Sequence, residues 1–255
     1  MGFTFAYLIL LLPVLVISMA VIMLLSLGRL RVFGTRWVGY ILGKTSLAVA
    51  GVKVREVYHE GKKPEGPAIF LINHSSTLDM FAILAMDLPR ARHIAKKEIQ
   101  YNPFFWMLAK LTGQIMIDRK DPRGAMEQLD QVYRDIRRNR NSIMFAPEGT
   151  RSRTGKIGPF KMGAFHAAIE LGYPIVPIYI EGAYELCPGG SLITLPGTIT
   201  GHFHPAIDTS SWDRKTARKK MPEIRTMYQK WAGELEEPET DSSDGDEALR
   251  TEMGR

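Results

Sequence analysis

Side chains suited to acid–base chemistry lie close together in residues 73–79, with the sequence Asn-His-Ser-Ser-Thr-Leu-Asp. His74 is followed five positions later by Asp79. If the chain bends into a helix at Ser75 or Ser76, the carboxylate of Asp79 can fold back to the imidazole. Such a partner would fix the tautomer of the ring and leave its other nitrogen free to accept a proton from a hydroxyl group. The segment therefore predicts a general base.

A second segment, residues 147–152, carries groups that suit a phosphate, in the sequence Pro-Glu-Gly-Thr-Arg-Ser. Gly149 lets backbone amides approach a ligand closely, and Thr150, Arg151 and Lys161 supply donors for phosphate oxygens. A third segment, residues 113–119, ends in Asp-Arg after an apolar run. An arginine at the end of a strand binds phosphate through paired donors.

Each segment also has a purely structural interpretation. A serine followed by Asp79 is a common helix start, because the helix dipole favours an acid in the first turn. Asp118 and Arg119 are compatible with a surface ion pair, and residues 147–152 with a polar turn whose charges are solvated. Taken singly, the segments leave these alternatives open.

The three segments follow short apolar runs, which are typical of buried strands. Residues 68–72 precede His74, residues 114–117 precede Arg119, and residues 142–145 precede Pro147. The sequence predicts an α/β fold in which a mostly parallel central sheet is flanked by helices. Polar loops at the carboxyl ends of such strands are where ligands bind. Further strands are expected at residues 49–58, 93–95, 175–180 and 198–204, and helices at residues 77–88, 102–110, 124–138, 161–171 and 212–231.

The charges are unevenly distributed. Residues 234–255 hold nine acidic and two basic side chains, so the 233 residues before them have a balance of +13, against +6 for the whole chain. A body this basic favours an anionic partner, such as lipid headgroups, a phosphorylated substrate, coenzyme A or nucleic acid. The single cysteine, Cys187, excludes an internal disulfide. His202 and His204 are compatible with one strand face, but no third ligand accompanies them, so no metal is expected.

The chain starts with an apolar segment. Residues 3–27 carry no charge, and 25 residues suffice to cross a hydrocarbon core of roughly 30 Å at about 1.5 Å per residue. Arg29, Arg31, Arg36 and Lys44 follow at once. By the positive-inside rule, we expect a membrane-associated protein whose catalytic domain lies on the cytoplasmic side.

A second apolar stretch, residues 37–50, is shorter than a membrane span. It is compatible with an interfacial helix under the lipid headgroups or with a core helix of the soluble domain. The predicted organisation is therefore membrane-anchoring helices in residues 1–50, a catalytic domain in residues 51–233, and an acidic tail in residues 234–255. The tail has almost no large apolar residues, so we expect it to be disordered.

The order and spacing of the three segments resemble the glycerolipid acyltransferase family, specifically its 1-acylglycerol-3-phosphate (lysophosphatidic acid) acyltransferases. The shared blocks are His-x4-Asp from His74, Gly-x4-Asp-Arg from Gly113 and Pro-Glu-Gly-Thr-Arg-Ser from Pro147. Residues 172–178 resemble a fourth block, a strand that borders the acyl site. The resemblance covers about residues 45–210. One departure is Ala146, where the family often has phenylalanine.

The resemblance implies a role for each matching residue. His74 would be the general base and Asp79 its orienting partner. Glu148 and Gly149 would position the glycerol portion of the acceptor. The cations that would hold the acceptor phosphate are Arg119, Arg151 and Lys161.

The resemblance implies transfer of an acyl chain from an acyl thioester to the free hydroxyl of 1-acylglycerol-3-phosphate, which gives phosphatidic acid. The donor would be acyl-CoA or acyl carrier protein, with no bound cofactor or metal. An alternative acceptor is glycerol-3-phosphate or another lysolipid. An alternative of another class is a membrane-tethered protein that binds anionic lipid or nucleic acid. Charge attraction needs no ordered His, Asp, Glu and Arg, and a strand face with RNA-binding aromatics is absent, so no nucleic-acid partner is expected.

Overall fold

The computed structural model describes residues 31–59, 65–88, 90–96, 114–117, 122–189 and 193–235, with single positions at 14, 17, 21, 101, 106 and 191. The predicted membrane segment (residues 3–27) and the predicted helix at residues 102–110 lie outside this description apart from isolated positions. Among the described helices, none has both the length and the apolar character needed to cross a bilayer.

The helices and strands alternate along the chain, as the sequence predicts. In chain order they are α3 (Arg31–Val49), β1 (Val52–Tyr58), β2 (Ile69–Ile72), α4 (Leu78–Ala85), β3 (Ala91–Lys96), β4 (Ile115–Ile117), α6 (Pro122–Asn139), β5 (Ser142–Phe145), α7 (Gly163–Leu171), β6 (Ile175–Glu181), α8 (Ala183–Leu186), β7 (Gly197–Phe203) and α9 (Arg214–Trp231).

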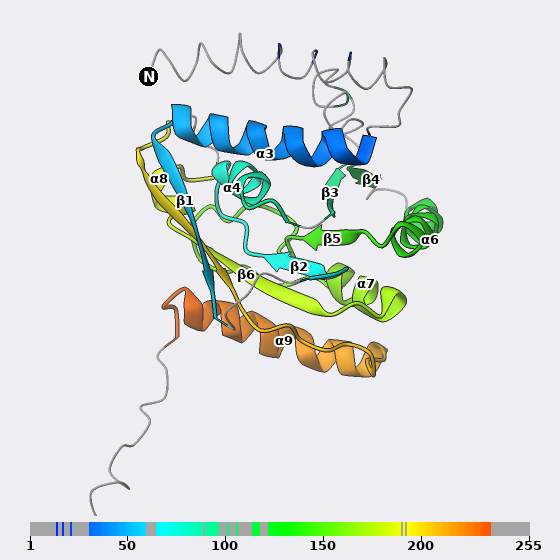
Figure 1. The fold of residues 1–255 in the computed structure, drawn as a ribbon. Coiled ribbons are helices and arrows are strands. Elements are labelled where there is room, and N and C mark those ends of the chain that lie inside the picture. Colours follow the sequence, from blue (N-terminus) through cyan, green and yellow to red (C-terminus); the bar gives the residue numbers. More distant parts are fainter. Residues whose placement is uncertain are drawn as a thin grey trace, which may run out of the picture.

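The strands in the described part of the chain form one seven-stranded sheet in the order β1-β7-β6-β2-β5-β3-β4 (Figure 1). The described neighbours pair in parallel except β6 and β7, which are antiparallel. The prediction of a mostly parallel sheet is confirmed. β2 pairs with both β5 and β6, so the segments that follow β2 and β5 leave the sheet side by side.

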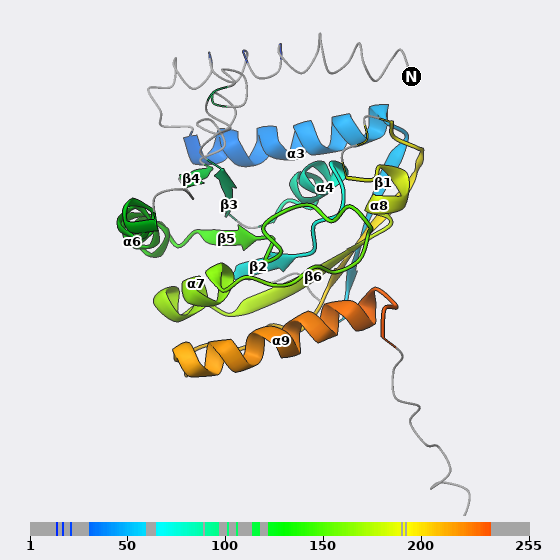
Figure 2. The ribbon, with the colours of Figure 1, turned by 180° about the vertical axis from the view of Figure 1, so that it is seen from behind.

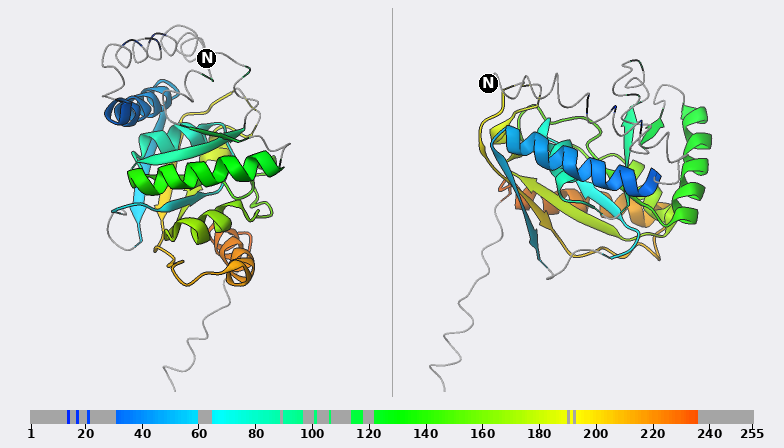
Figure 3. Two further views of the ribbon diagram at one scale, coloured as in Figure 1. Left: turned by 90° about the vertical axis from the view of Figure 1, so that its right-hand side faces the viewer. Right: turned by 45° about the horizontal axis from the view of Figure 1, so that its top comes forward.

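Apolar side chains cover both faces of the sheet. Along β2, Phe70 and Ile72 face a core shared with α3 and α4, whereas Ile69 and Leu71 face a second core shared with α6, α7 and α9. This alternation follows from the two-residue period of a strand, and it explains why residues 68–72 are apolar throughout. Figures 2 and 3 show the resulting layers, with α3 and α4 on one side of the sheet and α7 and α9 on the other.

Helix α3 packs closely against α4. A Cβ at Gly43 would lie 2.6 Å from the Phe81 carbonyl oxygen, so only glycine allows the two backbones to approach this far. Leu42 and Leu47 are buried, while Trp37 and Ile41 are exposed. The stretch at residues 37–50 therefore packs on the catalytic domain through one face and leaves apolar side chains on another.

Several predicted element boundaries differ from those in the structure. The helix expected at residues 77–88 ends at Ala85, because Asp87 has a φ of 49°, which an α-helix does not permit. The strand expected from residue 49 begins at Val52, because α3 continues to Val49 and a turn at Gly51 follows. Glu234, the first residue of the predicted acidic tail, accepts a hydrogen bond from the Ile157 amide at 2.6 Å.

Candidate active site

His74 leaves the sheet directly after β2 and meets the carboxylate of Asp79. The distance from His74 Nδ1 to Asp79 Oδ2 is 2.8 Å. The His74 side chain is 30% exposed and that of Asp79 only 1% exposed. Nδ1 is thus the partnered nitrogen, and Nε2 has no hydrogen bond to any described residue. This is the geometry that lets a carboxylate orient an imidazole.

The same carboxylate oxygen also shapes the loop. Asp79 Oδ2 accepts from the amides of Ser75 and Ser76, each at 2.8 Å. Ser76 in turn accepts from the Leu78 amide at 3.0 Å through its hydroxyl oxygen. The structural interpretation of this segment is correct for the acid in the first turn of α4, but the N-cap residue is Thr77 and not a serine, and the Thr77 side chain makes no capping hydrogen bond. One carboxylate both starts α4 and holds the imidazole.

Two backbone contacts fix His74 to the loop after β5. The His74 amide donates to Glu148 Oε1 at 2.9 Å, and the His74 carbonyl accepts from the Ser152 amide at 2.7 Å. Since Asp79 also binds the imidazole ring, His74 is fixed at its amide, its carbonyl and its side chain. The motif at residues 147–152 therefore contacts the backbone of His74 through Glu148 and Ser152.

Glu148 is buried, with 6% of its surface exposed. Its second oxygen, Oε2, accepts from the Gly158 amide at 3.0 Å. Burial raises the pKa of the Glu148 carboxyl, and the hydrogen bonds from the amides of His74 and Gly158 act in the opposite direction. Both oxygens are directed at backbone groups of the protein.

The Lys161 side chain lies directly against Gly149 in the turn after β5. Gly149 has a φ of 73°, in the left-handed region that favours glycine, and a Cβ there would lie 2.9 Å from Lys161 Nζ. The Lys161 amide donates to the Pro147 carbonyl at 2.8 Å, which fixes the lysine backbone to the same turn. The absence of a side chain at Gly149 therefore makes room for the ammonium group.

Arg151 lies beside the histidine loop. Its Nη1 donates to the Thr77 hydroxyl at 2.6 Å, and its side chain is exposed, as is Thr150. Arg119, the other expected phosphate ligand, lies outside the described residues. The structure thus brings His74, Asp79, Glu148, Gly149, Arg151 and Lys161 to the carboxyl ends of β2 and β5.

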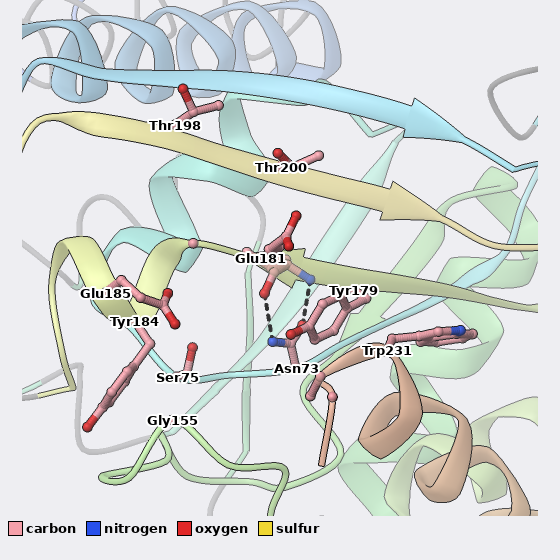
Figure 4. A pocket seen from close by; sticks show the side chains of 14 residues that line it. Asn73, Ser75, Gly155, Tyr179, Glu181, Tyr184, Glu185, Thr198, Thr200 and Trp231 are labelled. Atoms are coloured by element: carbon pink, nitrogen blue, oxygen red, sulfur yellow. Dashed lines mark hydrogen bonds between the residues drawn. The ribbon is translucent and has the colours of Figure 1, made fainter. Parts of the chain in front are cut away.

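Asn73 contributes to this site in a way that the sequence does not indicate. Its side-chain amide donates to the Ile180 carbonyl at 2.9 Å, and its carbonyl oxygen accepts from the Ile180 amide at 2.7 Å (Figure 4). This two-way bond ties the residue before His74 to β6. The two residues are 107 positions apart, so only the sheet order could have revealed the contact.

A cavity of about 590 Å³ lies next to this loop, lined among others by Ser75, Tyr179, Glu181, Glu185 and Trp231 (Figure 4). His74, Arg151 and Lys161 do not line it. Burial, followed by the carboxylates of Glu181, Glu185 and Glu234, raises the pKa of Tyr179 to about 12. The carboxylates of Glu181 and Glu185 in this lining would repel a phosphate group.

Three histidines gather away from the catalytic candidate. The rings of His59 and His204 stack at 4.3 Å between centroids, and His59 Nε2 lies 3.4 Å from His202 Nδ1. The sequence did not place His59 with the other two. Within the described part of the chain, no three histidine, cysteine or carboxylate side chains are arranged to hold a metal ion.

The His74–Asp79 pair lies after the parallel strand β2, and Arg151 and Lys161 lie in the loop after its neighbour β5. The protein is therefore an α/β protein with a polar site at the carboxyl ends of its strands. A sequence model of the family described as Acyltransferase matches residues 53–181. The chain belongs to this acyltransferase family.

Two relatives of the chain share the name of one acyltransferase activity. The chain is 30% identical over 222 residues to the 1-acyl-sn-glycerol-3-phosphate acyltransferase of Cocos nucifera, covering 87% of this chain and 71% of that one. It is 31% identical over 198 residues to the protein of the same name from Escherichia coli, covering 78% and 80%. The crystal structure of the 1-acyl-sn-glycerophosphate (LPA) acyltransferase PlsC from Thermotoga maritima shares the fold, with a TM-score of 0.64 at 22% identity over 89% of this chain and 98% of that chain.

Proposed function

We propose that this protein transfers an acyl chain from an acyl thioester to the free hydroxyl of 1-acylglycerol-3-phosphate, which gives phosphatidic acid. The observation that carries the proposal is the 2.8 Å contact between His74 Nδ1 and Asp79 Oδ2, in a loop whose Thr77 hydroxyl accepts a hydrogen bond from Arg151. The names of the relatives support this choice of acceptor.

The reaction needs one base and no acyl-enzyme. His74 Nε2 takes the proton of the acceptor hydroxyl while the hydroxyl oxygen attacks the thioester carbonyl carbon. The new C–O bond forms, the C–S bond breaks, and the imidazolium returns its proton to the departing thiolate. Asp79 stabilises the imidazolium between these steps. A thioester is already activated, so no covalent intermediate with the protein is required.

The acceptor phosphate binds beside the histidine in this proposal. Arg151 extends from the loop that holds the His74 carbonyl, and Lys161 lies over Gly149 in the same turn. A guanidinium and an ammonium at this position would anchor the phosphate while the glycerol hydroxyl reaches the imidazole. Thr150 and Arg119 complete the proposed set of phosphate ligands.

Glu148 has a positioning role in this scheme. Its two oxygens accept the amides of His74 and Gly158 and leave no free oxygen directed at a substrate. It would therefore place the catalytic loop, whereas the family resemblance implies contact with the glycerol portion. The donor is acyl-CoA or acyl carrier protein.

The protein would act at a membrane surface, with its catalytic domain on the cytoplasmic side. The acceptor is a lipid, and the apolar segment at residues 3–27 is followed by a cluster of basic residues. The exposed Trp37 and Ile41 on α3 support contact with the interfacial region of a bilayer.

The test is acyl transfer by the purified full chain in mixed micelles. His74→Ala should lower the rate by about 10²–10⁴-fold or more, because the proton acceptor is lost. A His166→Ala variant is the matched control, since His166 is an exposed residue of α7. A folded His74→Ala protein with full activity would refute the assignment.

The acceptor is tested separately. Lysophosphatidic acid, glycerol-3-phosphate and lysophosphatidylethanolamine are each offered with acyl-CoA and with acylated carrier protein. The proposal expects the highest kcat/KM with lysophosphatidic acid. A preference for either of the other acceptors by wild-type protein would move the reaction to the alternative acyltransferase activities.

A further inference from the structure

Arg225, on helix α9, contacts the loop that carries the proposed phosphate ligands. Its guanidinium donates from Nε to the Gly158 carbonyl at 2.8 Å and from Nη2 to the Ile157 carbonyl at 3.2 Å. The side chain is partly buried. These contacts join residues 67 and 68 positions apart, and none of the motifs in the sequence includes Arg225.

The peptide group between Ile157 and Gly158 links Arg225 to Glu148. Its carbonyl oxygen faces the guanidinium, and its N–H donates to Glu148 Oε2 at 3.0 Å. In a trans peptide these two groups point in opposite directions, and the described bonds include no cis peptide. One planar unit therefore lies between a cation and a carboxylate, with its dipole aligned to both.

The link continues to the histidine. The other oxygen of Glu148 accepts from the His74 amide at 2.9 Å. Glu148 is buried and exchanges neither bond easily with water. Arg225 is thus connected to the backbone of His74 through the peptide 157–158 and the Glu148 carboxylate.

Residues 157 and 158 are held by hydrogen bonds with both α9 and the residues after it. Glu234 accepts from the Ile157 amide at 2.6 Å, so α9 and the residues after it bind both adjoining peptide groups. A Cβ at Gly158 would lie 3.0 Å from Glu148 Oε2, tighter than most such contacts. A side chain at residue 158 would push against the carboxylate and disturb its position.

We propose that Arg225 is a positioning residue for acyl transfer, which acts on His74 through the peptide group 157–158 and Glu148. It touches neither substrate. The proposal rests on the proposed role of His74 as the base. Loss of the guanidinium leaves the carbonyls of Ile157 and Gly158 without these donors and frees the peptide to turn away from Glu148.

The kinetic test compares Arg225→Met, Arg225→Lys and Arg218→Met in the full chain. Arg218 is an exposed residue of the same helix and serves as the control. Arg225→Met should lower kcat about 10- to 100-fold, because small displacements of a catalytic group cost this much, with KM for the acceptor within about twofold. Arg225→Lys should recover part of kcat, because its ammonium still reaches one carbonyl.

A double-mutant cycle tests the route. If Arg225 acts through Glu148, the double variant Arg225→Met/Glu148→Gln should have the kcat of Glu148→Gln alone. If the fold-losses in kcat of the two single variants multiply in the double variant, the two residues act independently and the proposal is wrong. An unchanged kcat in Arg225→Met, or a rise in KM without a fall in kcat, would also overturn it.

Hydrogen exchange at the His74 amide separates this proposal from the proposed function. Arg225→Met should expose the His74 amide to faster exchange, and Arg218→Met should not. If wild-type protein transfers no acyl group but the His74 amide responds to Arg225, the function fails and the link stands. An amide that exchanges at the wild-type rate in Arg225→Met refutes the link, whatever the activity.

Discussion

At the scale of single residues, His74 is held by short contacts from three directions. Asp79 binds the ring, Glu148 the amide and Ser152 the carbonyl. The entropy of orienting the imidazole is therefore lost during folding and not during each reaction cycle. Asp79 Oδ1 is buried without a hydrogen-bond partner among the described residues, so the carboxylate binds through Oδ2 alone.

Asp79→Asn should lower kcat by about 10²-fold or more. The neutral amide removes the charge that stabilises the imidazolium, and it places an N–H group in a buried position. The measurement is kcat at saturating acceptor, with circular dichroism to show that α4 persists. Wild-type kcat in a folded Asp79→Asn protein would mean that the carboxylate only starts the helix.

Arg151→Met should raise KM for lysophosphatidic acid about 10- to 100-fold, because a charge-assisted hydrogen bond to phosphate contributes about 1.5–3 kcal/mol. With monoacylglycerol, which lacks the phosphate, the same substitution should change little. Arg138→Met, at an exposed position of α6, is the control. An equal loss with both acceptors would show that Arg151 supports the loop through Thr77 and does not bind phosphate.

At the scale of helices and strands, the close crossing of α3 and α4 connects the N-terminal region to the catalytic loop. Asp79 lies in the first turn of α4, and Gly43 of α3 contacts that helix near its C-terminal end. The other face of α3 carries exposed apolar side chains. A helix with exposed apolar side chains therefore packs directly on the helix whose first turn holds the Asp79 carboxylate that contacts His74.

Gly43→Val should destabilise the protein by about 1–3 kcal/mol, since its side chain would overlap the backbone of Phe81 and Ala85. The expected fall in Tm is about 2–4 °C for each kcal/mol in a domain of this size. Ala48→Val, at an exposed position of the same helix, controls for the change in helix propensity. Equal melting temperatures for the two variants would contradict the packing argument.

At the scale of the whole molecule, local contacts could be predicted from the sequence, whereas long-range contacts could not. The pairing of His74 with Asp79 spans five residues, and the apolar run before it indicates a strand, so both follow from the sequence. The bonds of Asn73 to Ile180 and of Arg225 to Gly158 depend on strand order and on where α9 packs. No local pattern encodes either, because each partner is an ordinary backbone group.

The histidine cluster at the end of β7 makes global stability depend on pH. Burial, with smaller effects from His59 and His202, lowers the pKa of His204 to about 4. The unfolded chain takes up a proton near pH 6.5 and the folded one only near 4, so stability should fall as the pH drops through this window.

His204→Phe keeps an aromatic ring against Trp231, which stacks on His204 at 3.5 Å between centroids, but removes the titrating group. Its melting temperature should therefore fall less than that of wild-type protein between about pH 6.5 and 4. His166→Gln is the control at an exposed site. Parallel curves for wild type and His204→Phe would assign the acid sensitivity to other groups.

The two-way amide bond between Asn73 and Ile180 has a consequence for engineering acceptor selectivity. It ties the start of the His74 loop to β6 through the side-chain amide of Asn73 and the backbone of Ile180. Thr150, on the rim of the site, is exposed, whereas Arg151 beside it donates a hydrogen bond to Thr77 in the His74 loop. Libraries directed at position 150 can therefore vary the rim without removing that contact.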